Sequence, residues 1–180
     1  MTTPHGLEHR LEHFRHAFDQ AFAAAPTGTV ETFEDLLAVR VAGDRYALRA
    51  GEIRGLVVSR RIVPLPSRRP ELLGVAGHRG MLVPVYSLAA LLGYGAGLTA
   101  TPWLALVGGS EPLGLGFEQF EGFLRVRSGD IRTARDPGRA TPHAGQVVLV
   151  DNQSRQVVDI PKALGQLAVR AGTAPSLKES

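Results

Sequence analysis

The chain has 180 residues, of which 44% are hydrophobic and 21% are charged, and its formal net charge is +3. These values are typical of a folded globular protein and argue against wholesale disorder, and no apolar run reaches the length of about 18 residues that a membrane-spanning helix needs. The chain has no cysteine, which excludes disulfides, thiolate metal sites and a cysteine nucleophile, and we expect a cytoplasmic protein without direct membrane insertion.

The N-terminal segment predicts an amphipathic helix, because its apolar residues recur at steps of three or four. The apolar face consists of Leu7, Leu11, Phe14, Phe18 and Phe22. Pro26 ends the pattern and begins a linker, so that residues 1–35 form a helix and linker ahead of the main domain. The apolar face either packs on the rest of the chain or binds a partner or a second copy.

Four histidines, His5, His9, His13 and His16, lie in the same segment at helical spacing, which lets two imidazoles share a metal ion. The segment lacks the His-Glu-x-x-His order of a zinc-protease helix. A solvated helix face is therefore our interpretation, and we expect no metal site.

Residues 36–170 predict many short strands. A β-hairpin is expected over 37–41 and 46–49 around the turn residues Gly43 and Asp44, preceded by a short helical piece around 32–37. Further strands are expected at 53–58, 81–86, 103–107, 113–117, 123–126 and 146–151, with short helices at 88–92 and 161–168. Such a pattern favours a β-barrel or a sandwich. A division into two halves near 93–102 stays open, and residues 171–180 are expected to form a disordered tail.

The middle of the chain contains a distinctive motif. Residues 73–88 read LGVAGHRGMLVPVYSL, with an Arg-Gly turn followed by a hydrophobic strand that contains proline. This stretch resembles the signature of the CheW-like family of chemotaxis coupling proteins. Tyr46, the strand at 53–58 and the IVPLP stretch at 62–66 match upstream. The stretches GLGFE at 114–118 and VVDIPKAL at 157–164 match downstream. The resemblance therefore covers about 36–167 in the right order.

This resemblance implies an all-β fold with added helices, built as two five-stranded SH3-like barrels over residues 36–170. It implies no enzyme activity and no cofactor. The implied function is a non-catalytic scaffold or adaptor that couples the cytoplasmic tip of a methyl-accepting chemoreceptor to the regulatory domain of a CheA-type histidine kinase. Such a protein is cytoplasmic and is recruited to membrane-associated receptor arrays.

The resemblance also implies two contact surfaces. The residues expected at the receptor are Arg79, Gly80, His78 and Ser87. The residues expected at the kinase are Ile53, Leu56, Val57 and Val58. Leu82, Val83 and Val85 are expected in the core.

The chain departs from the family pattern at Gly77, His78 and Ser87, and the acidic position of the pattern falls near Gly55, so three polar side chains of the pattern are missing or changed. A divergent scaffold that binds only one of the two partners is therefore an alternative. A small nucleic-acid-binding barrel is a second alternative, because Arg60, Arg61, Arg68 and Arg69 make a basic stretch. No ladder of stacking aromatic residues accompanies that stretch, so we do not expect nucleic acid as a partner.

Overall fold

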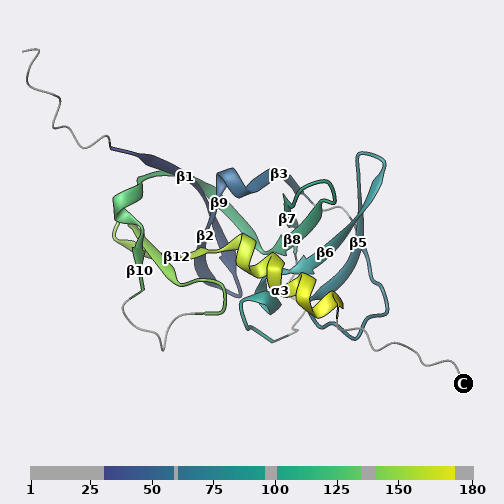
Figure 1. Ribbon diagram of the computed structural model, residues 1–180. Coiled ribbons are helices and arrows are strands. Elements are labelled where there is room, and N and C mark those ends of the chain that lie inside the picture. Colours follow the sequence, from purple (N-terminus) through teal and green to yellow (C-terminus); the bar gives the residue numbers. More distant parts are fainter. Residues whose placement is uncertain (1–30, 59–60, 96–100, 135–140, 173–180) are drawn as a thin grey trace, which may run out of the picture. The chain divides into compact units, whose positions relative to one another are not determined.

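The computed structural model describes residues 31–58, 61–95, 101–134 and 141–172. The expected N-terminal amphipathic helix and residues 173–180 of the expected tail lie outside these ranges. The described part is mostly β-strand, as the sequence predicts (Figure 1).

The first six strands in chain order are β1 (Phe33–Val41), β2 (Asp44–Arg49), β3 (Ile53–Val58), β4 (Ile62–Val63), β5 (Leu72–His78) and β6 (Met81–Ser87). The next six are β7 (Trp103–Val107), β8 (Leu113–Phe117), β9 (Gln119–Arg127), β10 (Arg132–Thr133), β11 (Gln146–Val150) and β12 (Gln153–Val158). The helices are α2 (Leu88–Leu91) and α3 (Ile160–Gly172), and the 3-10 turns are η1 (Ala50–Glu52) and η2 (Ser128–Asp130).

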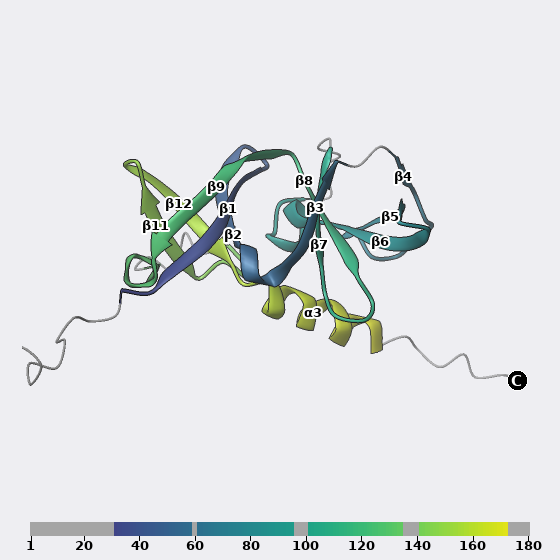
Figure 2. The same cartoon turned by 90° about the horizontal axis from the view of Figure 1, so that it is seen from above.

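The strands form two mixed sheets. The first sheet has the order β10-β11-β12-β2-β1-β9, and the second has the order β3-β7-β8-β6-β5-β4. Each contains one parallel pair, β12 with β2 in the first and β6 with β8 in the second. Helix α3 leaves the first sheet after β12 and runs toward the second (Figures 1 and 2).

Most predicted elements are confirmed, including the first hairpin, the strand at 53–58 and both short helices. The helical piece expected around 32–37 is wrong, because β1 begins at Phe33 and pairs with both β2 and β9. Each sheet has six strands instead of the expected five, since the two-residue strands β4 and β10 add to the edges. Strands β6 and β7, on either side of the possible division near 93–102, belong to the same sheet.

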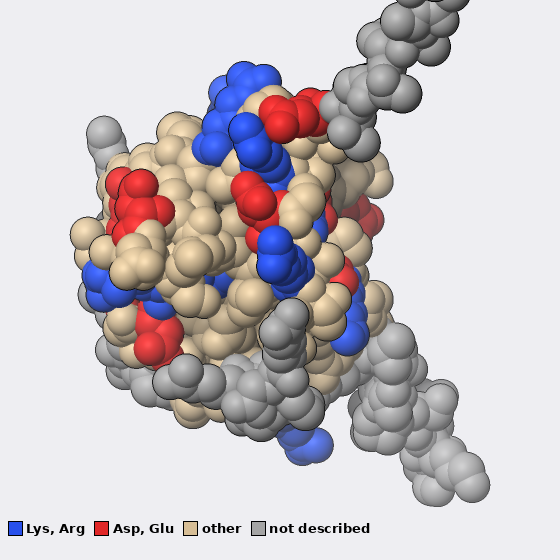
Figure 3. All heavy atoms as spheres, turned by 90° about the vertical axis from the view of Figure 1, so that its left-hand side faces the viewer, with Lys and Arg blue, Asp and Glu red and all other residues tan. Residues whose placement is uncertain are grey.

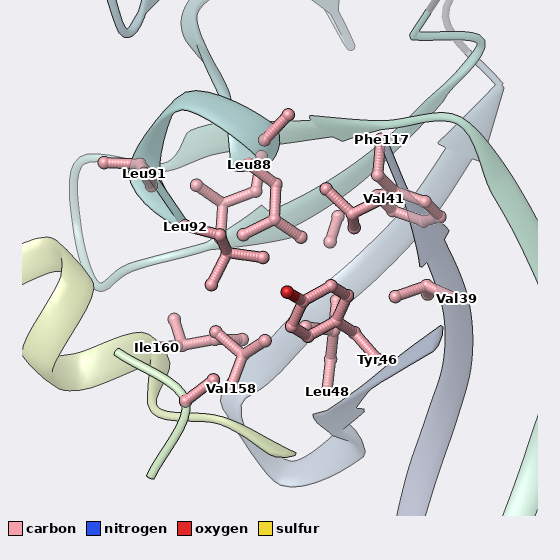
Figure 4. Close-up of a cluster of buried hydrophobic side chains, with 14 of the residues drawn as sticks. Val39, Val41, Tyr46, Leu48, Leu88, Leu91, Leu92, Phe117, Val158 and Ile160 are labelled. Atoms are coloured by element: carbon pink, nitrogen blue, oxygen red, sulfur yellow. The ribbon is translucent and has the colours of Figure 1, made fainter. Parts of the chain in front are cut away.

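One hydrophobic core spans both sheets and is centred on the fully buried Tyr46 of β2. The buried side chains drawn around its ring in Figure 4 include Val39, Val41, Leu48, Leu88, Leu92, Phe117, Val158 and Ile160. They come from β1, β2, β8, β12, α2 and α3 and from the residue after α2. Both sheets and both helices therefore pack around the side chain of Tyr46. The two sheets are therefore packed as one body around shared apolar surface.

Gly74 in β5 is required by close backbone packing. A Cβ atom at this position would lie 2.0 Å from the carbonyl oxygen of Val63, and the φ angle of Gly74 is +143°. Gly77 lies three residues further along the same strand, and a Cβ atom there would meet nothing within 4 Å.

We expect Gly74→Ala to lower the free energy of unfolding by about 2–4 kcal/mol, because both the backbone angle and the contact with Val63 must change. Gly77→Ala is the matched control and should change it by less than about 1 kcal/mol. Urea unfolding of the two variants measures both values. Equal losses at the two positions would contradict the packing described for β5.

Candidate partner-binding surface

The β5–β6 hairpin presents Arg79 at its tip. His78 and Met81 are cross-strand partners, and Arg79 and Gly80 form the two-residue turn between them. Their φ angles of +48° and +80° are both positive, as in the type I′ turns that connect such hairpins. Arg79 is exposed and makes no hydrogen bond or ion pair with the described residues, so its guanidinium is free for a partner.

A pocket of about 420 Å³ opens beside the tip half of this hairpin. It is lined by Val57, Val58, Arg61, Ala76, Gly77, His78, Val83, Leu104 and Leu106. The lining is mainly apolar, with Arg61 and His78 as its polar groups. The structure therefore brings Val57 and Val58, which are expected at the kinase, together with His78, which is expected at the receptor.

Exposed apolar side chains lie on the elements that form the pocket. Val58 is 60% exposed and Leu82 is 76% exposed, and Met81 next to Leu82 is also exposed. The expectation that Leu82 lies in the core is wrong, because side chains alternate along β6 and only Val83 and Val85 point inward. Adjacent exposed apolar residues of this kind are typical of an interaction surface.

A row of three aromatic side chains links the two sheets, and the sequence analysis missed it. The ring centroids of Trp103 in β7 and Phe120 in β9 are 5.5 Å apart, and those of Phe120 and Phe123 are 5.2 Å apart. Phe123 is 69% exposed. We call these residues the aromatic row. The only sequence signal was the spacing of Phe120 and Phe123, and the β-bulge between them hides which face each occupies.

The family model for the CheW-like domain matches residues 35–168. The chain belongs to the CheW-like family. This family consists of non-catalytic chemotaxis scaffolds, so the chain is a scaffold or adaptor and not an enzyme.

A solved structure supports the fold of this CheW-like chain. The crystal structure of the scaffolding protein TtCheW from Thermoanaerobacter tengcongensis superposes with a TM-score of 0.62 at 16% identity, covering 71% of this chain and 90% of that one. At this identity the likeness establishes the fold alone. A search of curated proteins found no match.

Three of the expected contact residues contribute to neither the hairpin tip nor the pocket of this CheW-like domain. Ser87 is only 6% exposed, and its hydroxyl accepts a hydrogen bond of 3.2 Å from the backbone N–H of Ala90 at the start of α2. Ile53 and Leu56 are half-buried against the core that both sheets share. Ser87 thus serves as a helix cap with little surface to offer, and the four residues expected at the kinase divide between core and pocket.

The described ranges contain no group of three or more His, Cys, Asp or Glu side chains placed to hold a metal ion. Nor does any helix within them have the length and apolar character needed to cross a membrane. On the face seen in Figure 3, basic and acidic side chains are interspersed. That face therefore lacks the continuous basic surface that nucleic acid binding favours.

Two further ionisable groups, Tyr94 after α2 and Glu52 in η1, have shifted pKa values. Burial raises the pKa of Tyr94 above its ordinary value, and hydrogen bonds to Asp44 and Tyr46 add a smaller increase. Burial also raises the pKa of Glu52 in η1, although Arg49 opposes this effect. Both groups favour their neutral forms, as expected for polar groups packed beside the shared core.

Glu121 in β9 ties three strands of the first sheet together. Its carboxylate lies 2.6 Å from Nε of Arg40 in β1 and 2.6 Å from a terminal guanidinium nitrogen of Arg155 in β12. Burial alone would raise the pKa of Glu121, but the hydrogen bonds and charges of Arg155 and Arg40 outweigh it and hold this pKa below its ordinary value. Arg155 is only 8% exposed, so its charge depends on this carboxylate.

We expect Glu121→Gln to lower the free energy of unfolding by about 1–3 kcal/mol at neutral pH, because it leaves buried Arg155 without a counter-charge. A carboxyl group whose pKa is lower in the folded state stabilises the fold at pH values above the ordinary Glu pKa of about 4.3. This stability is lost as the pH falls through the folded-state pKa. The difference between wild type and variant should therefore shrink in acid.

Urea unfolding across this pH range measures the effect. Glu111→Gln serves as the control, because Glu111 is exposed and makes no side-chain interaction within the described ranges. A loss for Glu121→Gln that stays constant down to strongly acidic pH would contradict the ion pairing.

Proposed function

We propose that the chain is an adaptor that couples the cytoplasmic tip of a chemoreceptor to a CheA-type histidine kinase at a receptor array. The observation that carries the proposal is the free Arg79 at the tip of the β5–β6 hairpin, beside an apolar pocket with exposed apolar neighbours. A non-catalytic scaffold acts through such contacts alone. The second sheet offers both a charged and an apolar contact within one region.

The receptor contact is assigned to the hairpin tip, formed by His78, Arg79 and Gly80. An arginine without an internal partner can bind a carboxylate with two parallel hydrogen bonds, which fixes both distance and orientation. The tight turn holds the backbone of Arg79 in one conformation, so less freedom is lost on binding. An acidic residue near the receptor tip is the partner that this geometry favours.

The kinase contact is assigned to β3 and the pocket behind it. Strand β3 is one of the two edge strands of the second sheet and pairs only with β7 among the described strands. Its free edge can add to a strand of a similarly folded regulatory domain. Val58, exposed beside the pocket, supplies an apolar anchor for that contact.

Linking two modest contacts on one scaffold raises the effective concentration of each partner for the other. A change in receptor conformation reaches the kinase only if the scaffold makes different contacts in the two receptor states. The hairpin tip and β3 lie close together, since residues of both line one pocket, so a shift at the receptor contact can directly affect the kinase contact.

We expect Arg79→Glu to weaken binding to the receptor tip by at least about tenfold while binding to the kinase regulatory domain persists. Val58→Asp should do the reverse, since it places a charge in the apolar contact, and the exposure of Val58 allows the variant to fold. Arg132→Glu, at an exposed position in the first sheet, is the control for a change of net charge. Pull-down assays with each purified partner measure all three variants.

A scaffold for a single partner is the second candidate, because Val57, Val58 and His78 line one pocket. In that case Arg79→Glu and Val58→Asp should weaken binding to the same partner, and the other partner should not bind the wild type. Failure of the wild type to bind either partner would rule out the adaptor function.

A further inference from the structure

Three arginine side chains lie next to one another on the first sheet. Arg40 of β1 is the cross-strand partner of Arg45 of β2. Strand β12 runs parallel to β2 with Gln156 opposite Tyr46, so Arg155 lies level with Arg45. Level residues on neighbouring strands share a face of the sheet, and we call these three residues the arginine row.

A single carboxylate, that of Glu121, lies within this row. One of its oxygens is 2.6 Å from Nε of Arg40, and the other is 2.6 Å from the guanidinium of Arg155. Both oxygens are thus occupied by the outer two arginines. Arg45, between them, makes no hydrogen bond or ion pair within the described part of the chain, although its Nε atom is buried.

The neighbouring acids have other partners. Glu118 accepts hydrogen bonds from the backbone N–H groups of Ala42 and Gly43, at 3.0 and 3.2 Å. Asp44, the residue before Arg45, accepts a hydrogen bond of 2.5 Å from the hydroxyl of Tyr94. Glu118 thus stabilises the β1–β2 turn, and Asp44 forms a contact between the sheets. Neither carboxylate neutralises Arg45.

Three guanidiniums share one carboxylate here, so this half-buried site carries two excess positive charges. Like charges on neighbouring strands repel, and a buried guanidinium nitrogen without an acceptor is unfavourable. Glu121 shows how the sheet solves the problem for Arg40 and Arg155, because it divides two oxygens between two guanidiniums. A second carboxylate placed beside Arg45 would repeat the same arrangement.

We propose that Arg45 binds a carboxylate from an acidic segment of a protein partner, and that the arginine row is a third contact site of this scaffold. The site lies on the first sheet, whereas the hairpin tip, β3 and the pocket lie on the second. It therefore does not rest on the assignment of receptor and kinase surfaces, and its failure would leave those assignments standing.

The first test titrates the ¹⁵N-labelled full chain with a short polyglutamate peptide and follows the arginine Nε–H resonances by NMR. The Arg45 resonance, assigned by its loss in Arg45→Lys, should shift in a saturable, salt-sensitive way. Arg45→Lys keeps the charge but loses the planar guanidinium, and should weaken binding by about tenfold. Arg54→Lys, at an exposed arginine of β3, should leave binding unchanged.

Three results would overturn the proposal: equal affinity of Arg45→Lys and wild type, equal weakening by Arg54→Lys, or a saturable shift with inorganic phosphate but not with the peptide. The last result would mean a small-anion site instead of a site for an acidic segment. A glycine-serine peptide of the same length should cause no shift.

The second test supplies the carboxylate from within the chain. Arg45→Glu places an acid between Arg40 and Arg155, so the variant should unfold at a higher temperature than wild type and should not bind the peptide. Arg132→Glu, the same charge reversal at an exposed arginine of β10, is the control and should raise the melting temperature less. Unchanged or lower thermal stability together with retained peptide binding would contradict the proposal, and Arg45→Lys decides the matter if the Glu variant does not fold.

Discussion

The fold depends on the burial of Tyr46 in a core that both sheets share. Its ring is fully enclosed by side chains from both sheets and both helices, so neither sheet has a complete core of its own at this position. The hydroxyl group of Tyr46 is hydrogen-bonded to Tyr94 at 2.7 Å and lies 3.4 Å from the Thr141 hydroxyl. A buried tyrosine needs such partners, and here they come from the loops that follow α2 and β10. The relative position of the contact surfaces therefore follows from the packing around one side chain.

Much of the strand pattern could be predicted because alternation of apolar and polar residues reports directly on half-buried strands. The hairpin of β1 and β2 shows this, since Leu37, Val39 and Val41 alternate around a Gly-Asp turn. Strand β12 gave almost no such signal, because its first four residues are polar and one of them, Arg155, is buried. The partner of this buried charge is Glu121, which lies more than thirty residues earlier in the chain.

The contact surfaces were predictable only where a local turn determines them. Arg79 and Gly80 stand out in the sequence because a two-residue turn with positive φ angles favours glycine, and the structure places both at an exposed tip. The aromatic row and the outward orientation of Leu82 could not be found in this way. The first depends on a bulge in β9, and the second on which face of β6 meets the core, a face that Val83 and Val85 occupy.

The order of the strands constrains how this chain acquires its structure as it is synthesised. All six strands of the second sheet lie in one continuous stretch from β3 to β8, whereas the first sheet needs β1 and β2 from before that stretch and β9 to β12 from after it. A ribosome therefore releases every strand of the second sheet before the first sheet has its closing partners. Until β12 emerges, β2 lacks its parallel neighbour and Tyr46 lacks Val158 and Ile160. The nascent chain thus exposes an unpaired strand and part of its core for most of translation, which makes this interval its point of greatest risk for misassembly.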